Sequence, residues 1–187
     1  MKGFANVFGV DDGPFARRHR GDVALCGVAY ARERLTGVVY GKLRKDGANA
    51  TEAIARLVGA SRFAEHARCV LLGGVTFGGF NVVDAPALAD ALSRPVLVVM
   101  RRRPNLREMH RALADDVPGG TAKRRRLERA GPIERCGAVY VQRHGLSFAR
   151  AEATLALHTR DGHLPEPLRV AHLLAAAHVR GHSHGRA

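Results

Sequence analysis

The sequence predicts an α/β fold with a mixed sheet, and three observations support that prediction. Three runs with strand character follow one another near the N-terminus. Short apolar runs then alternate with helical patterns as far as the C-terminus. A chain of 187 residues with 46% hydrophobic content can bury one substantial core but hardly two. We therefore expect one domain over residues 1–180, followed by a disordered tail over residues 181–187.

The first strands favour an antiparallel meander. We expect them over residues 6–11, 23–30 and 35–41, because turns that carry glycine and arginine separate these runs. A further short run, residues 68–72, is largely apolar and ends in two glycines. This pattern is typical of a strand buried on both faces, which places it near the centre of the sheet.

Helices are expected between and after the later strands. In the first of them Asn49, Thr51 and Glu52 offer capping residues, and apolar positions keep helical spacing up to Gly59. The other predicted elements are helices over 84–92, 105–113, 147–157 and 165–179, and strands over 95–100 and 138–142. The stretch 115–133 contains a proline, two glycines and a basic run, and we predict a mobile insertion there.

The formal net charge of +13 is large for a chain of this size and favours a polyanionic partner such as DNA or RNA. Nearly all of the basic residues are arginines, since lysine occurs only at positions 2, 42, 45 and 123. Guanidinium groups suit bidentate contacts with phosphate. High arginine usage can also reflect codon composition, and exposed charge can be no more than a solvated surface.

Composition also argues against several classes of protein. No stretch of 18 or more uncharged apolar residues exists, and acidic residues follow the N-terminus too soon for a signal peptide. We therefore predict a cytoplasmic protein with no membrane partner. The three cysteines, Cys26, Cys69 and Cys136, lie far apart, which argues against both a zinc ribbon and a disulfide framework.

Two blocks of residues carry the candidate chemistry. Residues 9–15 (Gly-Val-Asp-Asp-Gly-Pro-Phe) place Asp11 and Asp12 where an apolar run meets turn residues, at the rim of the predicted sheet. Residues 165–172 supply His172 and an arginine one helical turn away from it. Both features have a second interpretation. The aspartates are also common turn formers, and the histidine lies among apolar residues that suit a core position.

Four ordered blocks make the chain resemble the archaeal family of uncharacterised proteins related to endonuclease V. Besides the two blocks above, they are residues 46–52 (Asp-Gly-Ala-Asn-Ala-Thr-Glu) and 74–84 (Gly-Val-Thr-Phe-Gly-Gly-Phe-Asn-Val-Val-Asp), so the resemblance spans nearly the whole chain. It implies a ribonuclease H-like fold, which the order of strands and helices also fits. Endonuclease V cleaves nucleic acid near deaminated purines with acidic residues that bind magnesium. The resemblance therefore implies a metal-dependent nuclease.

Roles for individual residues follow from the resemblance. It implies that Asp11 and Glu52 are metal ligands for magnesium or manganese, and that His172 lies near the site and positions a water or a phosphate. These three are the predicted catalytic residues. Glu52 also fits a capping box, in which its role would be structural. The third acid of endonuclease V aligns with Gly73, which has no side chain to bind a metal.

Other carboxylates are alternative ligands in place of that third acid. Asp12, Asp46 and Asp84 are the candidates. Adjacent residues of a strand point to opposite faces, which separates Asp12 from Asp11 unless the chain is already turning. For phosphate contact we predict the basic residues of two runs and of the last helix: Arg101, Arg102, Arg103, Lys123, Arg124, Arg125, Arg126 and Arg169.

Two functions from different classes are therefore expected. The first is a divergent endonuclease V-like, magnesium- or manganese-dependent nuclease or nucleic-acid-processing protein that acts on phosphodiester bonds. The second, motivated by Gly73, is a non-catalytic nucleic-acid-binding protein whose metal site has decayed. A third interpretation, a protein that acts on other proteins, would be favoured if binding to nucleic acid lacked a steep salt dependence.

Overall fold

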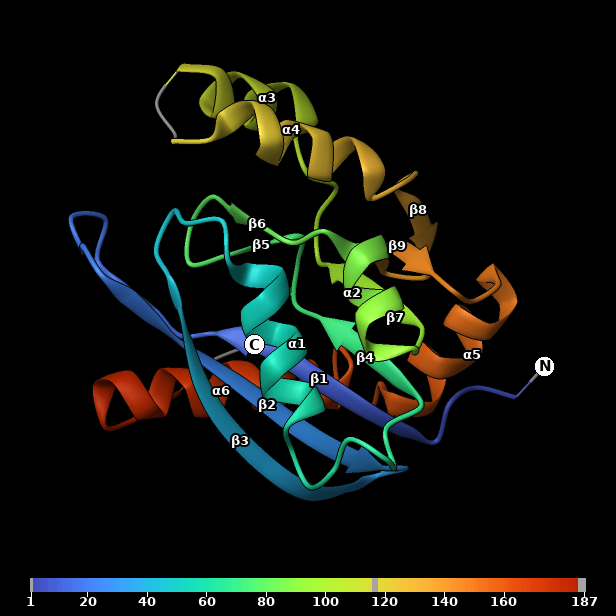
Figure 1. Cartoon of the computed structure of the whole chain (residues 1–187). Helices are drawn as coiled ribbons and strands as arrows, with labels where there is room; N and C mark the ends of the chain where they lie inside the picture. Colours follow the sequence, from blue (N-terminus) through green and yellow to red (C-terminus); the bar gives the residue numbers. More distant parts are fainter. Residues whose placement is uncertain (1, 116–117, 185–187) are drawn as a thin grey trace.

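A mixed sheet forms the centre of the computed structural model, which describes residues 2–115 and 118–184 (Figure 1). Its strands are β1 (Asn6–Asp12), β2 (Asp22–Ala31), β3 (Arg34–Arg44), β4 (Cys69–Leu72), β7 (Val96–Met100), β8 (Glu134–Cys136) and β9 (Val139–His144). Two short strands, β5 (Thr76–Phe77) and β6 (Asn81–Val82), form a separate hairpin. The helices are α1 (Ala50–Gly59), α2 (Ala85–Leu92), α3 (Leu106–Asp115), α4 (Gly120–Arg129), α5 (Phe148–His158) and α6 (Glu166–Arg180).

The strand order in the sheet is β3-β2-β1-β4-β7-β9-β8. Strands β1, β2 and β3 pair antiparallel, as the sequence predicts. Strand β4 lies at the centre and pairs parallel with both β1 and β7, which confirms its predicted position. The carboxyl ends of β1, β4 and β7 therefore meet at one edge of the sheet. In open α/β sheets this is the edge at which ligands usually bind.

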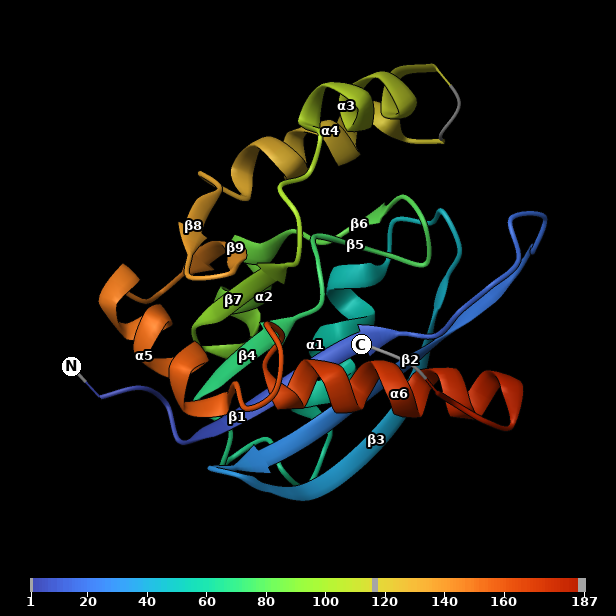
Figure 2. The same ribbon diagram turned by 180° about the vertical axis from the view of Figure 1, so that it is seen from behind.

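Helices cover both faces of the sheet, and the two views in Figures 1 and 2 show α1 and α6 on opposite sides. Phe8 and Val10 of β1 point into the core that includes Ile54 of α1. Val7 of the same strand points into the core that includes Leu168 of α6. Because side chains alternate along a strand, β1 directs its last two residues to different faces.

Helix α6 packs unusually close to β1, and glycine allows the close approach. A Cβ atom at Gly9 would lie 2.6 Å from the backbone carbonyl of Pro167, and one at Gly13 would lie 2.9 Å from Cγ2 of Val179. The lack of a side chain at these two glycines therefore lets the helix lie close over the second half of the strand. His172 lies between Pro167 and Val179 in α6, so it is held above the carboxyl end of β1.

The stretch 115–133 contains helix α4, which the sequence analysis does not predict. A proline and two glycines precede the basic run; the proline and Gly119 lie before the helix, with Gly119 in a left-handed conformation at the N-cap, and Gly120 is the first residue of the helix. Residues 116–117 of this stretch lie outside the described residues, and the predicted disordered tail is described only as far as residue 184. No helix in the described ranges combines the length and the apolar character needed to cross a bilayer.

Candidate active site

The candidate active site is centred on Asp11, which ends up largely buried at the carboxyl end of β1 with 13% of its side chain exposed. Its Oδ2 lies 3.0 Å from Nδ1 of His172. Its Oδ1 accepts a hydrogen bond of 3.0 Å from the backbone amide of Asp12. The structure therefore brings together two residues that lie 161 positions apart in the sequence.

His172 is prepared to carry a positive charge. The hydrogen bond with Asp11 raises the pKa of the imidazole above its usual value, and partial burial and the nearby charge of Arg101 oppose that rise. Arg101 follows β7 at the same edge of the sheet. A protonated His172 donates from Nδ1 to the carboxylate, and its half-exposed ring leaves the other nitrogen available to a substrate.

Asp12 points to the face opposite Asp11, where its Oδ2 accepts a hydrogen bond of 2.7 Å from the amide of Gly78. Burial and the negative charge of Asp11 raise the pKa of Asp12 to about 7. The two carboxyl groups therefore interact at the strand end even though they belong to different faces. The sequence analysis expected this opposite orientation, which the contact with Gly78 confirms.

Gly73 lies directly beside Asp11, at the carboxyl end of β4. Its amide donates to the carbonyl of Val10, and a Cβ atom at this position would lie 2.7 Å from Oδ1 of Asp11. A larger residue would have to displace that carboxylate. The glycine therefore does more than omit an acid, because it leaves the space that the Asp11 carboxylate occupies.

Three other predicted ligands lie in different surroundings. The side chain of Glu52 is exposed in the first turn of α1 and makes no hydrogen bond or ion pair with a described residue. Asp46 accepts from the amide of Phe80 at 2.8 Å and pairs with Lys45. Asp84 caps α2 and forms an ion pair with Arg129. Within residues 2–115 and 118–184, no three His, Cys, Asp or Glu side chains cluster as a metal site.

The expected capping box of α1 does not form. The side chain of Asn49 makes no cap hydrogen bond and instead accepts from the amide of Arg44 and from Nδ2 of Asn81. The hydroxyl of Thr51 accepts from the amide of Asp84. These contacts tie the start of α1 to β6 and α2, and they leave Glu52 without the structural role that a capping box would give it.

The predicted phosphate-binding residues divide into two groups. Arg101, Arg102, Arg103, Arg124 and Arg125 are exposed. The other three bond to groups of the protein itself. Lys123 is buried and donates to the carbonyl of Asp46 at 2.6 Å. Arg126 donates to the carbonyls of Ala48 and Val82, and Arg169 makes a bidentate ion pair with Glu166. Lys123 is thus not accessible to a nucleic acid in this structure.

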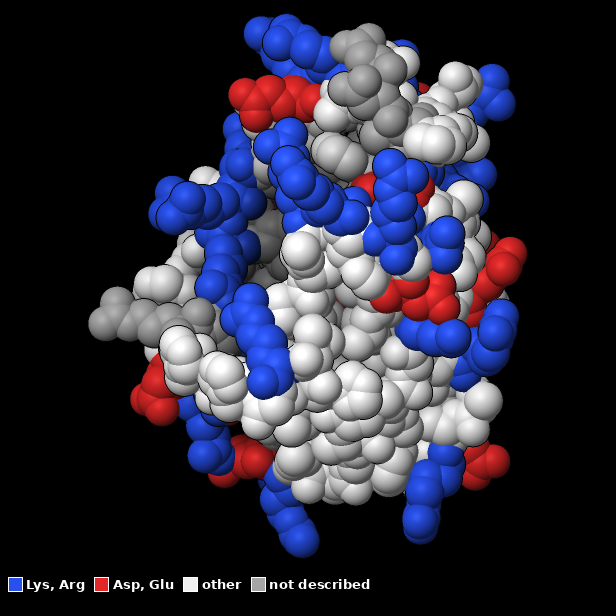
Figure 3. Space-filling view, turned by 90° about the vertical axis from the view of Figure 1, so that its left-hand side faces the viewer, with Lys and Arg blue, Asp and Glu red and all other residues white. Residues whose placement is uncertain are grey.

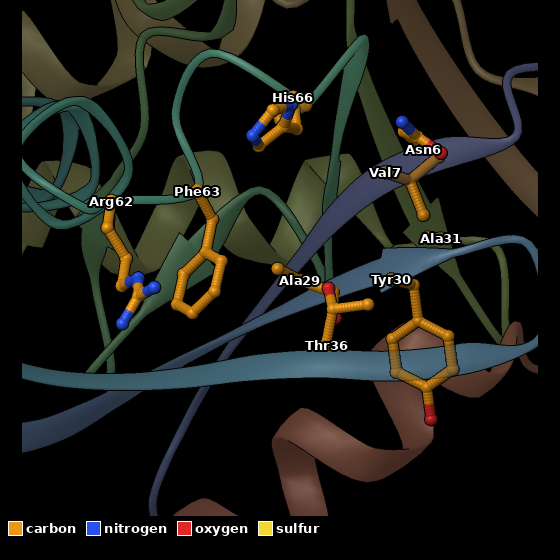
Figure 4. Close-up of a pocket in the computed structure, with 10 residues that line it drawn as sticks. Asn6, Val7, Ala29, Tyr30, Ala31, Thr36, Arg62, Phe63 and His66 are labelled. Atoms are coloured by element: carbon orange, nitrogen blue, oxygen red, sulfur yellow. The ribbon is translucent and has the colours of Figure 1, made fainter.

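A pocket of about 410 Å³ lies at the opposite end of the sheet (Figure 4). Arg62, Phe63 and His66, from the segment after α1, lie over the strands that carry Ala29 and Thr36, whereas the ring of Tyr30 points to the other face of the sheet. The pocket includes the start of β1, whereas Asp11 lies at the end of that strand. No carboxylate lines it, so it supplies no anionic ligand for a cation.

Comparison with known proteins places the chain in a family. The model of the family described as endonuclease dU matches residues 4–179. A UPF0215 protein of Deinococcus radiodurans is 50% identical over 182 residues, which cover 97% of this chain and 93% of that protein. Both matches extend over the strands and helices that form the candidate active site.

Solved structures show which known folds this fold resembles. A protein of unknown function from Archaeoglobus fulgidus matches with a TM-score of 0.86 and 33% identity, over 96% of this chain and 99% of that one. Endonuclease V of Ciona intestinalis, in complex with DNA that contains an inosine followed by a ribo-adenosine, matches with a TM-score of 0.56 and 15% identity, over 89% and 82% of the two chains. The chain therefore belongs to the endonuclease dU family, and its mixed α/β fold is similar to that of endonuclease V.

Proposed function

We propose that this protein is a divergent, metal-dependent endonuclease that cleaves phosphodiester bonds in nucleic acid. The observation that carries the proposal is the contact of 3.0 Å between Asp11 and His172 at the carboxyl edge of the sheet. An acid and a histidine at one site can bind a cation and move a proton, which are the two functions that phosphodiester hydrolysis requires. Membership of the endonuclease dU family supports the same reaction class.

The donor set at the strand end fits a hard divalent cation. Magnesium is usually held by one or two carboxylates, with water in its remaining positions. Asp11 and Asp12 would supply these carboxylates, and each carboxylate oxygen that bonds the protein can still accept from a second partner. Burial, and then the negative charge of Asp11, raise the pKa of Asp12, and a bound cation would favour the charged form of this carboxylate. When bound, magnesium or manganese would neutralise phosphate charge and acidify a water.

His172 and Arg101 act on the substrate side of this site. His172 orients the Asp11 carboxylate through Nδ1 and holds a proton that can be passed to a leaving oxygen. Arg101 is exposed beside it and can bind a phosphate oxygen, as can Arg102 and Arg103. Glu52 stays a predicted metal ligand, and its side chain is exposed in the first turn of α1.

Names of similar proteins suggest the substrates to test first. The family description refers to deoxyuridine, and the endonuclease V from Ciona is bound to DNA that contains inosine. Both nucleosides contain a base that is a product of deamination. We therefore propose a nucleic acid that carries a deaminated base as the substrate class.

The test is cleavage of labelled single- and double-stranded DNA and RNA, with and without deoxyuridine or inosine, in magnesium or manganese. We expect Asp11→Asn to lower the cleavage rate at least about 10³-fold, because metal-assisted stabilisation of the transition state is worth several kcal/mol. Asp84→Asn is the matched control, since it changes another predicted ligand from acid to amide and keeps a side chain that caps α2. Equal rates in Asp11→Asn and wild type would contradict the proposal.

A second function is favoured by Gly73 and by the absence of a three-ligand cluster among the described residues. In that case the protein binds nucleic acid without cleaving it. Metal dependence separates the two functions. A binding protein would retain full affinity in a chelator and in Asp11→Asn, and it would show no cleavage with either metal.

A further inference from the structure

A hollow of about 800 Å³ lies beside the candidate active site and is lined mainly by basic residues. We call it the basic hollow and define it by Arg17, Arg18 and Arg20 of the β1–β2 loop and by Arg44 and Lys45 at the end of β3. The β1–β2 loop projects to the left in Figure 1, and Figure 3 shows lysine and arginine side chains gathered around a depression on that face. None of these five residues belongs to the basic runs that the sequence analysis selected.

Most of the positive charge in the basic hollow is not neutralised by the protein. Arg17, Arg18, Arg20 and Arg44 are exposed, and none of them makes an ion pair with a described residue. Asp46, the acid that lines the hollow, pairs with Lys45 at 2.8 Å, and Asp22, at the start of β2, pairs with Lys42 at 2.9 Å. Four guanidinium groups that face one hollow repel one another in the absence of an anion. The hollow therefore suits a ligand that carries several negative charges.

The loop that presents these arginines is anchored by its backbone. The amide of Lys45 donates to the carbonyl of Gly21 at 2.9 Å, and Nζ of Lys45 donates to the carbonyl of Arg17 at 3.3 Å. The ring of His19 bonds the carbonyl of Asp22 at 2.9 Å. The arginine side chains take no part in these contacts, so the loop keeps its anchors when those side chains are changed.

A short chain of hydrogen bonds connects the basic hollow to the acid pair. Asp46 lines the hollow, and its amide donates to the carbonyl of Gly78 at 2.8 Å. The amide of Gly78 donates in turn to the carboxylate of Asp12 at 2.7 Å. One residue thus separates the wall of the hollow from Asp12. A polyanion in the hollow would extend directly toward the carboxyl end of β1.

We propose that the basic hollow binds the sugar-phosphate backbone of the nucleic acid on one side of the cleaved bond. The guanidinium fork of arginine matches two phosphate oxygens, and the charge of several arginines around one hollow suits the successive phosphates of a strand better than a single small anion. The inference rests on the proposed nucleic-acid substrate, but not on cleavage. The hollow would give affinity and orientation, and base recognition would come from elsewhere.

Binding in the absence of metal tests this inference. The triple variant Arg17→Gln, Arg18→Gln, Arg20→Gln is compared with wild type by fluorescence anisotropy on labelled single- and double-stranded DNA and RNA, in EDTA and over a range of KCl concentrations. We expect at least about a tenfold loss of affinity at low salt. The slope of log K against log salt should fall by about 2 to 3, because each lost phosphate contact removes about 0.7 to 0.9.

The matched control is Arg34→Gln, Arg62→Gln, Arg68→Gln, which removes the same charge from exposed arginines near the opposite end of the sheet. We expect its salt slope to stay close to that of wild type. Equal losses in both triple variants would show an effect of net charge alone and overturn the inference, as would unchanged binding in the loop variant or a wild type that binds no nucleic acid. Cleavage by wild type is scored separately, so the basic hollow and the proposed nuclease function can fail independently.

Discussion

The acids at the end of β1 differ from the acids of the neighbouring loops in how the protein compensates their charge. Asp11 has His172 as its partner, and Asp12 makes no ion pair with a described residue. Asp46 pairs with Lys45 and Asp84 pairs with Arg129. At the strand end the partner of Asp11 is thus a histidine, which is charged only when protonated, and Asp12 has no cationic partner among the described residues, whereas the acids of the loops pair with a lysine and an arginine.

The basic residues divide in the same way. Lys123 and Arg126 of α4 donate to backbone carbonyls of the Asp46 loop and of β6, so they fix the loops around the site. The side chains of Arg17 and Arg18 have no such partner in the part of the chain that the structure describes. Among these basic residues, those bonded to the protein thus have a structural role, and those without a partner among the described residues are available to a ligand.

The largest predicted effect on stability is a decrease as pH rises, which results from the titration of Asp12. Its pKa is about 7 in the folded protein and near 3.8 in the unfolded chain, so the folded state binds more protons between these values and loses stability as pH rises toward 7. The loss has an upper limit of about 1.4 kcal/mol per pH unit. His172 adds to the same trend, because its raised pKa stabilises the fold below about 6.5 and the benefit disappears above its folded pKa.

Thermal unfolding from pH 5 to pH 8 without divalent ions measures this trend. In Asp12→Asn we expect a flatter profile, with only the contribution of His172 remaining. Magnesium should raise the Tm of wild type more at pH 8 than at pH 5, since the free carboxylate is its ligand. Parallel profiles for wild type and variant would mean that the charge of Asp12 is compensated after all.

The next largest effect is expected at the buried lysine of α4. Lys123→Met removes a charged hydrogen bond to the carbonyl of Asp46 and should lower the free energy of unfolding by about 2 to 3 kcal/mol. Arg124→Gln is the control in the same basic run, where an exposed side chain should change stability by less than about 0.5 kcal/mol. Urea titration of both variants gives the comparison, and similar values would refute the structural role of Lys123.

A smaller effect, on cleavage, is expected at His172. His172→Ala leaves the Asp11 carboxylate without its orienting partner and should lower the rate about 10- to 100-fold. His178→Ala is the control in the same helix, because the ring of His178 stacks on the ring of Tyr40, whereas the ring of His172 bonds the carboxylate of Asp11. If the two variants cleave at the same rate, His172 is a packing residue only.

Much of the fold could be predicted from the sequence because the strands carry continuous apolar runs. Strands β1, β4 and β7 and the antiparallel meander appear where they are expected. Helix α4 was missed because its mean composition is polar and its buried positions include Lys123. Strands β5 and β6 have two residues each, too few for a periodic pattern.

The site could be predicted only in part, for a similar reason. Asp11 and His172 occupy characteristic blocks of sequence, and the structure brings them together. The sequence shows that Lys45 stands next to Asp46, but it does not show that the amide of Phe80, 34 residues away, also bonds this carboxylate. The basic hollow was likewise missed, since Arg44 comes from β3 and the other arginines from the loop before β2.

The smallest effect should come from Asp84, the acid whose role is local. Its side chain accepts from the amide of Ala87 and caps α2, so Asp84→Ala should lower the free energy of unfolding by about 1 kcal/mol. Asp84→Asn keeps a capping oxygen and should cost less, although it breaks the ion pair with Arg129. Equal losses in Asp84→Asn and Asp84→Ala would show that the ion pair with Arg129, rather than the cap, supplies the contribution of this acid. Asp84 would then be compensated by charge in the same way as Asp46.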